Sequence, residues 1–147
     1  MNTKTLKGLG TAVSLLLAAS PALATSTGLQ TLGAPANSID VFTFTCPAGF
    51  IGAAARVDDR EPPINPALMQ VVLSKDGFPT VQQTAPDDAG GSSAFATVLD
   101  GSGLYAVVFK KTNVGIEAYI GDVFCVQPAV PLNILQNVVG LKRQINQ

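Results

Sequence analysis

Five acidic side chains gather in two loop-like segments, and they are the residues best placed to do chemistry. Carboxylates in loops can bind calcium, which takes several oxygen ligands, and paired carboxylates serve in glycoside hydrolysis. Neighbouring acids usually point apart or into water, and the DxDxDG-type spacing of calcium loops is missing. We therefore interpret them as solvated turn residues, partly neutralised by Arg60, and keep calcium as the alternative. The five are Asp58, Asp59, Glu61, Asp87 and Asp88.

Histidine is missing from the whole chain. Hydrolases of the Ser-His-Asp or Cys-His kind need a base near neutrality to take the nucleophile's proton, and zinc sites commonly combine His with Cys. We therefore predict that the protein is not an enzyme. We expect no catalytic residue, no metal and no cofactor, with calcium as the one alternative.

The two cysteines each end a strand-like run: Cys46 closes the first such run and Cys125 closes the last. In an oxidising compartment the simplest interpretation is a single disulfide between them. It would close a loop of roughly 80 residues, which the chain-entropy model values at about 4.5 kcal/mol. Free thiols, a redox pair and a metal site are the alternatives.

The N-terminus resembles a secretory signal peptide over residues 1–24, with Lys4 and Lys7 before an apolar run and a small-residue triplet ending at Ala24. The apolar run is shorter than a membrane-spanning helix. Cleavage near Ala24 removes two of the nine basic residues and none of the ten acidic ones, which leaves a net charge of −3. We predict a secreted or periplasmic bacterial protein with no membrane span and no nucleic-acid partner.

Between residues 38 and 126, short alternating runs of apolar and polar residues are separated by turn dipeptides, with no helical pattern between them. Seven or eight such runs predict an all-β fold, an antiparallel jelly-roll-like β-sandwich. Residues 25–37 are expected to be an N-terminal linker that adds at most one short edge strand. Tyr105 and Tyr119 are expected to face the core, which leaves Phe50 and Phe78 as the aromatics nearest the surface; for these we favour peripheral core packing.

Residues 127–147 differ from the rest. Asn133 can cap a short helix, and apolar residues then recur at helical spacing, although Gly140 weakens the pattern. We expect a short C-terminal helix or a tail that packs loosely on the domain. A tail that docks a partner is the alternative. The apolar stripe consists of Ile134, Val138, Leu141 and Ile145.

The order of these features resembles the bacterial pre-peptidase C-terminal (PPC) domain family. The segments that carry the resemblance are "DVFTFTCPAGF", "VVLSKDG", "GSGLYAVVF" and "EAYIGDVF", within residues 38–126. The resemblance implies a jelly-roll-like sandwich that accompanies secreted enzymes as a non-catalytic accessory and sometimes binds calcium or an extracellular polymer. The matching positions are Asp40, Phe42, Phe44, Pro47, Ala48, Gly49, Leu73, Asp76, Gly77, Gly103, Tyr105, Val107 and Tyr119.

Two functions fit these expectations. The first is a secreted, non-enzymatic accessory or binding module that recognises an extracellular protein or polymer through its loops. The alternative is a structural subunit of an extracellular filament or matrix. In that case the segment before Ser38 or the tail after Pro128 adds a strand to a neighbour's sheet, so self-association is expected.

Overall fold

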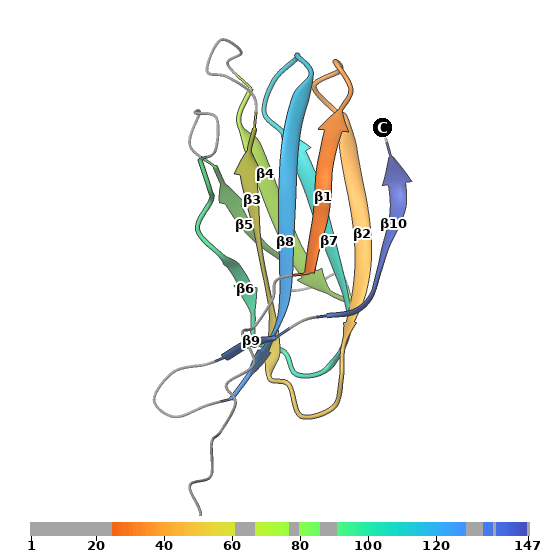
Figure 1. The fold of residues 1–147 in the computed structure, drawn as a ribbon, viewed down its shortest axis with the longest axis vertical. Helices are drawn as coiled ribbons and strands as arrows, with labels where there is room; N and C mark the ends of the chain where they lie inside the picture. The colour runs from red at the N-terminus through yellow and green to blue at the C-terminus, as the bar shows by residue number, and fades with distance from the viewer. Residues whose placement is uncertain are drawn as a thin grey trace, which may run out of the picture.

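The computed structural model describes residues 25–60, 67–76, 80–85, 91–128, 134–136 and 138–146, and these residues form ten strands (Figure 1). Every strand pair runs antiparallel. The expected signal peptide lies outside the described residues. The strands are β1 (Thr25–Leu32), β2 (Ile39–Cys46), β3 (Gly52–Asp59), β4 (Met69–Lys75), β5 (Thr80–Thr84), β6 (Ala96–Val98), β7 (Gly103–Lys111), β8 (Glu117–Gln127), β9 (Ile134–Gln136) and β10 (Val139–Asn146).

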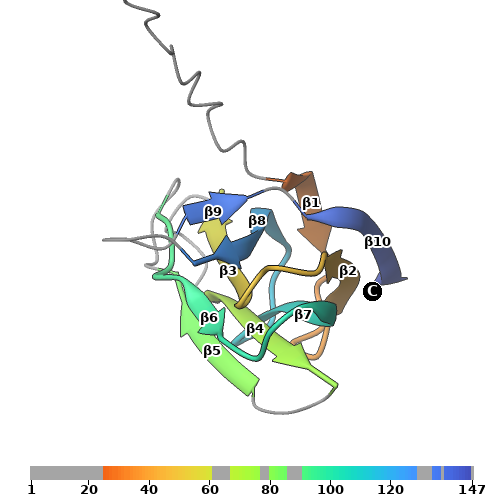
Figure 2. The ribbon, with the colours of Figure 1, turned by 90° about the horizontal axis from the view of Figure 1, so that it is seen from below.

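Two five-stranded sheets face each other (Figure 2). In sheet A the order is β1-β8-β3-β6, and the short β9 also pairs with β8; in sheet B the order is β10-β2-β7-β4-β5. Strands β1 to β8 follow the order of an eight-stranded, double-sheet jelly roll. The predicted all-β, antiparallel, jelly-roll-like sandwich is therefore confirmed, and the C-terminal segment adds two strands to it.

The short C-terminal helix that we expected is wrong, because the described part of this segment is strand. Residues 134–136 pair with the end of β8 in sheet A, and residues 139–146 then pair with β2 in sheet B. Asn133, the expected helix cap, lies outside the described residues. Gly140 has a φ of 67°, a left-handed conformation that glycine adopts readily and that does not belong in a regular helix.

The segment expected to be a linker contains an edge strand of eight residues, β1, which pairs with β8 from Thr25 to Leu32. The register of this pair shifts between Ser26 and Leu29. Gly28, within that irregularity, has a φ of 69°. Residues 25–32 therefore belong to the sandwich rather than leading up to it.

The core lies between the sheets and is built by simple alternation along the strands. Phe42, Phe44 and Cys46 of β2 point inward, and Tyr105 and Tyr119 are both fully buried, as the sequence predicted. Phe44 stacks on Tyr105 with ring centroids 5.7 Å apart. The described residues contain no helix that is long and apolar enough to cross a membrane.

The predicted disulfide is present between Cys46 and Cys125, whose Cα atoms lie 5.4 Å apart. It joins the end of β2 in sheet B to β8 in sheet A, and both cysteines are buried. The bridge therefore links the two layers of the sandwich through the core rather than pinning a surface loop. No described cysteine is free.

Candidate functional site

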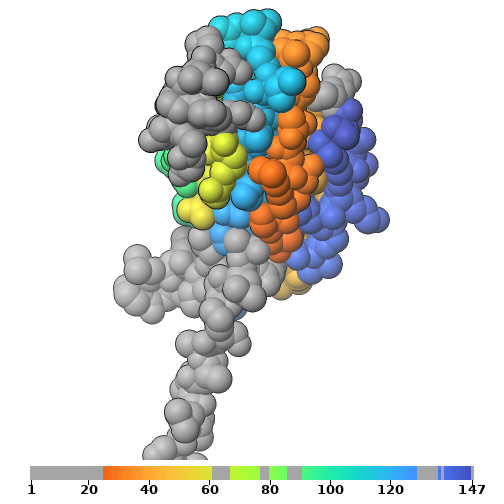
Figure 3. Space-filling model, turned by 45° about the horizontal axis from the view of Figure 1, so that its top comes forward, coloured from red at the N-terminus to blue at the C-terminus, as the bar shows by residue number. Residues whose placement is uncertain are grey.

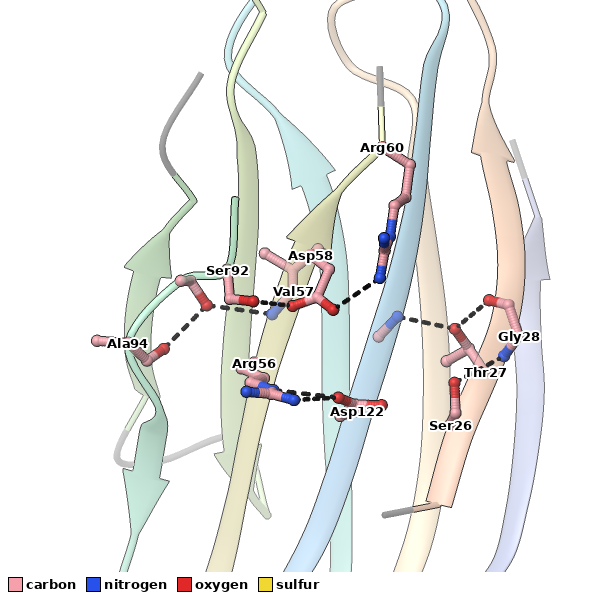
Figure 4. A network of polar contacts seen from close by, with 12 residues as sticks. Ser26, Thr27, Gly28, Arg56, Val57, Asp58, Arg60, Ser92, Ala94 and Asp122 are labelled. Atoms are coloured by element: carbon pink, nitrogen blue, oxygen red, sulfur yellow. Dashed lines mark hydrogen bonds and ion pairs between the residues drawn. The ribbon is translucent and has the colours of Figure 1, made fainter. Parts of the chain in front are cut away.

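Asp58 and Asp59, the first two predicted site residues, end β3. Successive side chains of a strand point to opposite faces, so the structure does not bring these two carboxylates together. The Ser92 hydroxyl donates to Oδ1 of Asp58, and Nη2 of Arg60 donates to Oδ2 at 3.2 Å (Figure 4). Arg60 thus neutralises Asp58, as the sequence suggested it could.

Asp58 is buried, so it is not a solvated turn residue, and neither is the buried Asp59. The backbone N–H of Asp59 donates to the carbonyl of Gly91 at 2.9 Å. Glu61, Asp87 and Asp88 lie outside the described residues, and their expected place in a loop site stays a prediction. Within the described ranges, no three His, Cys, Asp or Glu side chains are grouped so that they could hold a metal ion.

An ion pair crosses the outer face of sheet A between neighbouring strands. Arg56 of β3 lies directly opposite Asp122 of β8. Its Nε and Nη2 atoms donate to the same oxygen, Oδ2, at 3.1 and 2.9 Å (Figure 4). The Asp122 side chain is largely buried, whereas the Arg56 side chain is about one third exposed.

Phe95, just before β6, lies against this ion pair. Its ring meets the ring of Phe124 edge to face at 5.6 Å, and the Arg56 guanidinium lies 5.4 Å from its centroid. Phe124 is buried even though its position on β8 directs it outward. Phe95 itself remains 39% exposed. We call the surface formed by Phe95, Phe124, Arg56 and Asp122 the Phe95 face.

Sequence reasoning missed Phe95. Phe50, which we expected near the surface, is half-buried and packs against the core, so the favoured prediction of peripheral core packing is confirmed for it. Phe78 lies outside the described residues. One signal could have found Phe95: if Ala96 and Val98 face the core, then strand alternation turns the preceding Phe95 outward.

A third polar contact is buried inside the sandwich, and sequence reasoning missed it. Asp40 of β2 is fully buried. Its Oδ2 atom accepts hydrogen bonds from the Tyr119 hydroxyl and from Nη2 of Arg143, each at 2.6 Å. Burial raises the pKa of Tyr119 far above its usual range, and the hydrogen bond and negative charge of Asp40 raise it further. Arg143 belongs to β10, so the C-terminal strand supplies the counter-charge of a core carboxylate.

Lys111 is a buried cation at the end of β7. Its Nζ donates to the carbonyls of Gly33 and Gly115, which ties the turn after β1 to the turn before β8. Burial lowers the pKa of Lys111, and the negative charge of Glu117 acts in the opposite direction. This lysine holds two turns together, and we assign it a structural role.

The Phe95 face therefore offers a partly exposed aromatic ring just before β6, together with a partly exposed guanidinium on β3 and a fixed carboxylate on β8. The buried Asp40 contact holds strands together. The chain matches no model of a known protein family and no curated protein.

Proposed function

We propose that the chain is an exported, non-enzymatic binding module that recognises an extracellular polymer through the Phe95 face. The observation that carries the proposal is that the Phe95 ring is partly exposed and is held in place by contacts with Phe124 and Arg56. An exposed ring that is already held in place loses little conformational freedom when it binds a ligand.

The chemistry of the Phe95 face suits a polysaccharide. Sugar rings present apolar C–H faces that pack on an aromatic ring, and their hydroxyls both donate and accept hydrogen bonds. Arg56 can donate to a sugar hydroxyl from its exposed edge, because its Nε and Nη2 both bind the single oxygen Oδ2 of Asp122. The strands beneath, β3 and β8, are central in sheet A, so the surface is rigid.

Three features of the chain support the exported and non-enzymatic parts of the proposal. The N-terminal 24 residues resemble a signal peptide, and the disulfide Cys46–Cys125 is of the kind that persists in oxidising compartments. The chain also has no histidine to serve as a general base. The resemblance to the PPC family points to the same accessory role.

Co-sedimentation tests the proposal. Mature protein, residues 25–147, is incubated with insoluble cellulose, chitin or peptidoglycan, and the bound fraction is measured after centrifugation. We expect one of these polymers to retain the protein, Phe95→Ala to abolish retention and Phe95→Tyr to preserve it, because tyrosine restores the ring. Leu104→Ala is the matched control, since Leu104 is an exposed apolar residue of β7 in the other sheet.

Thermal midpoints show whether each variant remains folded. Retention of Phe95→Ala equal to that of the wild type would refute the role of the Phe95 face. If the folded protein binds none of the three polymers, the proposal of a polymer ligand is refuted, and an extracellular protein becomes the ligand to test.

A further inference from the structure

Strand β2 depends on β10 for the neutralisation of a buried charge. Asp40 is fully buried, and its partners among the described residues are Tyr119 and Arg143. The second carboxylate oxygen, Oδ1, accepts no hydrogen bond from the part of the chain that the structure describes. If β10 left, the carboxylate would keep one phenol and no cation. The outer edge of β2 therefore requires a strand that carries an arginine at this position.

Apart from the ion pair between Arg143 and Asp40, the contacts that keep β10 on the sandwich are weak. The residues of β10 are exposed except for the half-buried Leu141, although the Arg143 side chain itself is only 29% exposed. The register against β2 also shifts twice along the strand. A Cβ on Gly140 would meet nothing within 4 Å. Elements with few buried contacts and exposed hydrogen bonds open at low free energy. Arg143 is thus the main anchor, with Leu141 and Val138 packing against the core.

The strand can leave without dismantling the jelly roll. β10 is the last described strand, and only residues 137 and 138 connect it to β9, which belongs to the opposite sheet. Strands β1 to β8 contain the disulfide, and by themselves they form the two four-stranded sheets of the jelly roll, β1-β8-β3-β6 and β2-β7-β4-β5. Figure 3 shows β10 at the surface beside β1, at the side of the molecule where both sheets end.

We propose that β10 is an exchangeable strand that pairs with β2 of a second copy of this chain, where its Arg143 binds the Asp40 of that copy. A β10 from another copy carries the same residues and makes the same contacts, so exchange costs only the opening of the β10–β2 pair and the entropy of association. Protein concentration offsets that entropy, and exchange of an identical element between protomers is a low-cost route to self-association. The proposal does not depend on the Phe95 face.

Disulfide trapping between two differently labelled copies tests the exchange. Thr43 of β2 and Lys142 of β10 are register partners, so cysteines at these positions lie within reach of a disulfide. Mature Thr43→Cys protein is mixed at high concentration with mature Lys142→Cys protein, briefly warmed to open the edge, cooled and oxidised. We expect a reducible heterodimer on a non-reducing gel. In the control mixture, Ser74→Cys replaces Thr43→Cys, because Ser74 lies two strands away on β4, and we expect no heterodimer.

The double variant Thr43→Cys/Lys142→Cys shows whether the two positions close within one chain. If it closes internally while the mixture gives no heterodimer, the exchange is refuted. Equal heterodimer in both mixtures would mean random collision and would also refute it. Sedimentation of the wild type is independent of cysteine chemistry, and a chain that stays monomeric at every concentration after warming and cooling would overturn the proposal.

Discussion

Arg143 neutralises a carboxylate that the sandwich buries completely, and this gives the first prediction. Removing one partner of a buried ion pair leaves an uncompensated charge, which typically costs 3–5 kcal/mol. Because the Arg143 side chain is 29% exposed, we expect Arg143→Met to lower the free energy of unfolding by about 3 kcal/mol, the lower end of that range. Denaturant unfolding of the mature protein measures the change.

The neighbouring Lys142→Met provides the matched control, because Lys142 is an exposed cation of the same strand and should cost less than about 0.5 kcal/mol. Combining Arg143→Met with Asp40→Asn should recover part of the loss, since the buried charge is then removed together with its partner. Equal stabilities of Arg143→Met and Lys142→Met would contradict the role of Arg143.

Some residue-level features could be predicted from the sequence and others could not. The disulfide followed from two cysteines that each end a strand, and the inward Tyr105 and Tyr119 followed from alternation. Asp40 lies on the same inward face of β2 as Phe42. The sequence did not predict a buried charge there, because the cation that neutralises it, Arg143, lies 103 residues away along the chain. Phe95 was missed because its outward direction follows only once Ala96 and Val98 are known to face the core, and a strand of three residues gives little evidence of which face is buried.

At the scale of elements, β8 packs over β7 at a point that requires glycine. A Cβ on Gly121 of β8 would lie 2.2 Å from Cζ of Phe109, a buried ring of β7 in the opposite sheet. Overpacking a core costs about 1–3 kcal/mol, and we expect Gly121→Ala to reach the upper end because Phe109 is also held by the Tyr119 ring at 5.0 Å. Denaturant unfolding measures the loss.

The suppressor of Gly121→Ala is Phe109→Leu, which removes the ring atoms that would collide. We expect the double variant to be more stable than the sum of the two single losses predicts, since the two sites share one space. Strict additivity would show that the inter-sheet contact at Gly121 is not what the alanine disturbs.

The C-terminal segment shows why one element was assigned the wrong type. Its apolar residues recur at a spacing that suits a helix, and a strand should instead alternate strictly. The alternation of β10 is broken because its register against β2 shifts between Val139 and Lys142 and again between Arg143 and Ile145. Tertiary pairing with β2 therefore overrides the local pattern, and the single-sequence periodicity cannot reveal it.

At the scale of the whole molecule, the two-sheet architecture could be predicted because turn residues separate almost every pair of strands. The disulfide contributes to its stability by closing 79 residues of chain between sheets. We expect the double variant Cys46→Ala/Cys125→Ala to lose about 4.5 kcal/mol by the chain-entropy model. Comparison of its unfolding midpoint with that of the oxidised wild type measures the loss, and equal midpoints would contradict the prediction.

Alkaline pH should unfold the whole molecule through its two tyrosines, Tyr105 and Tyr119, the only ones in the chain. Burial raises the pKa of both side chains. The hydrogen bond to Asp40 raises the pKa of Tyr119 further, and the negative charge of Asp100 raises the pKa of Tyr105 further. The unfolded tyrosines ionise near pH 10, about their ordinary pKa, while the folded ones stay neutral. Unfolding therefore releases protons, so stability is retained below about pH 10 and falls as the pH rises above it.

Tyrosinate absorbance reports this transition directly, because the chain has no tryptophan. We expect the folded protein to show little tyrosinate at pH values where the same chain in guanidinium is fully ionised, and then a cooperative rise that coincides with loss of the strand signal in circular dichroism. A gradual titration centred on the ordinary tyrosine pKa, with the strand signal intact, would contradict the burial of both phenols.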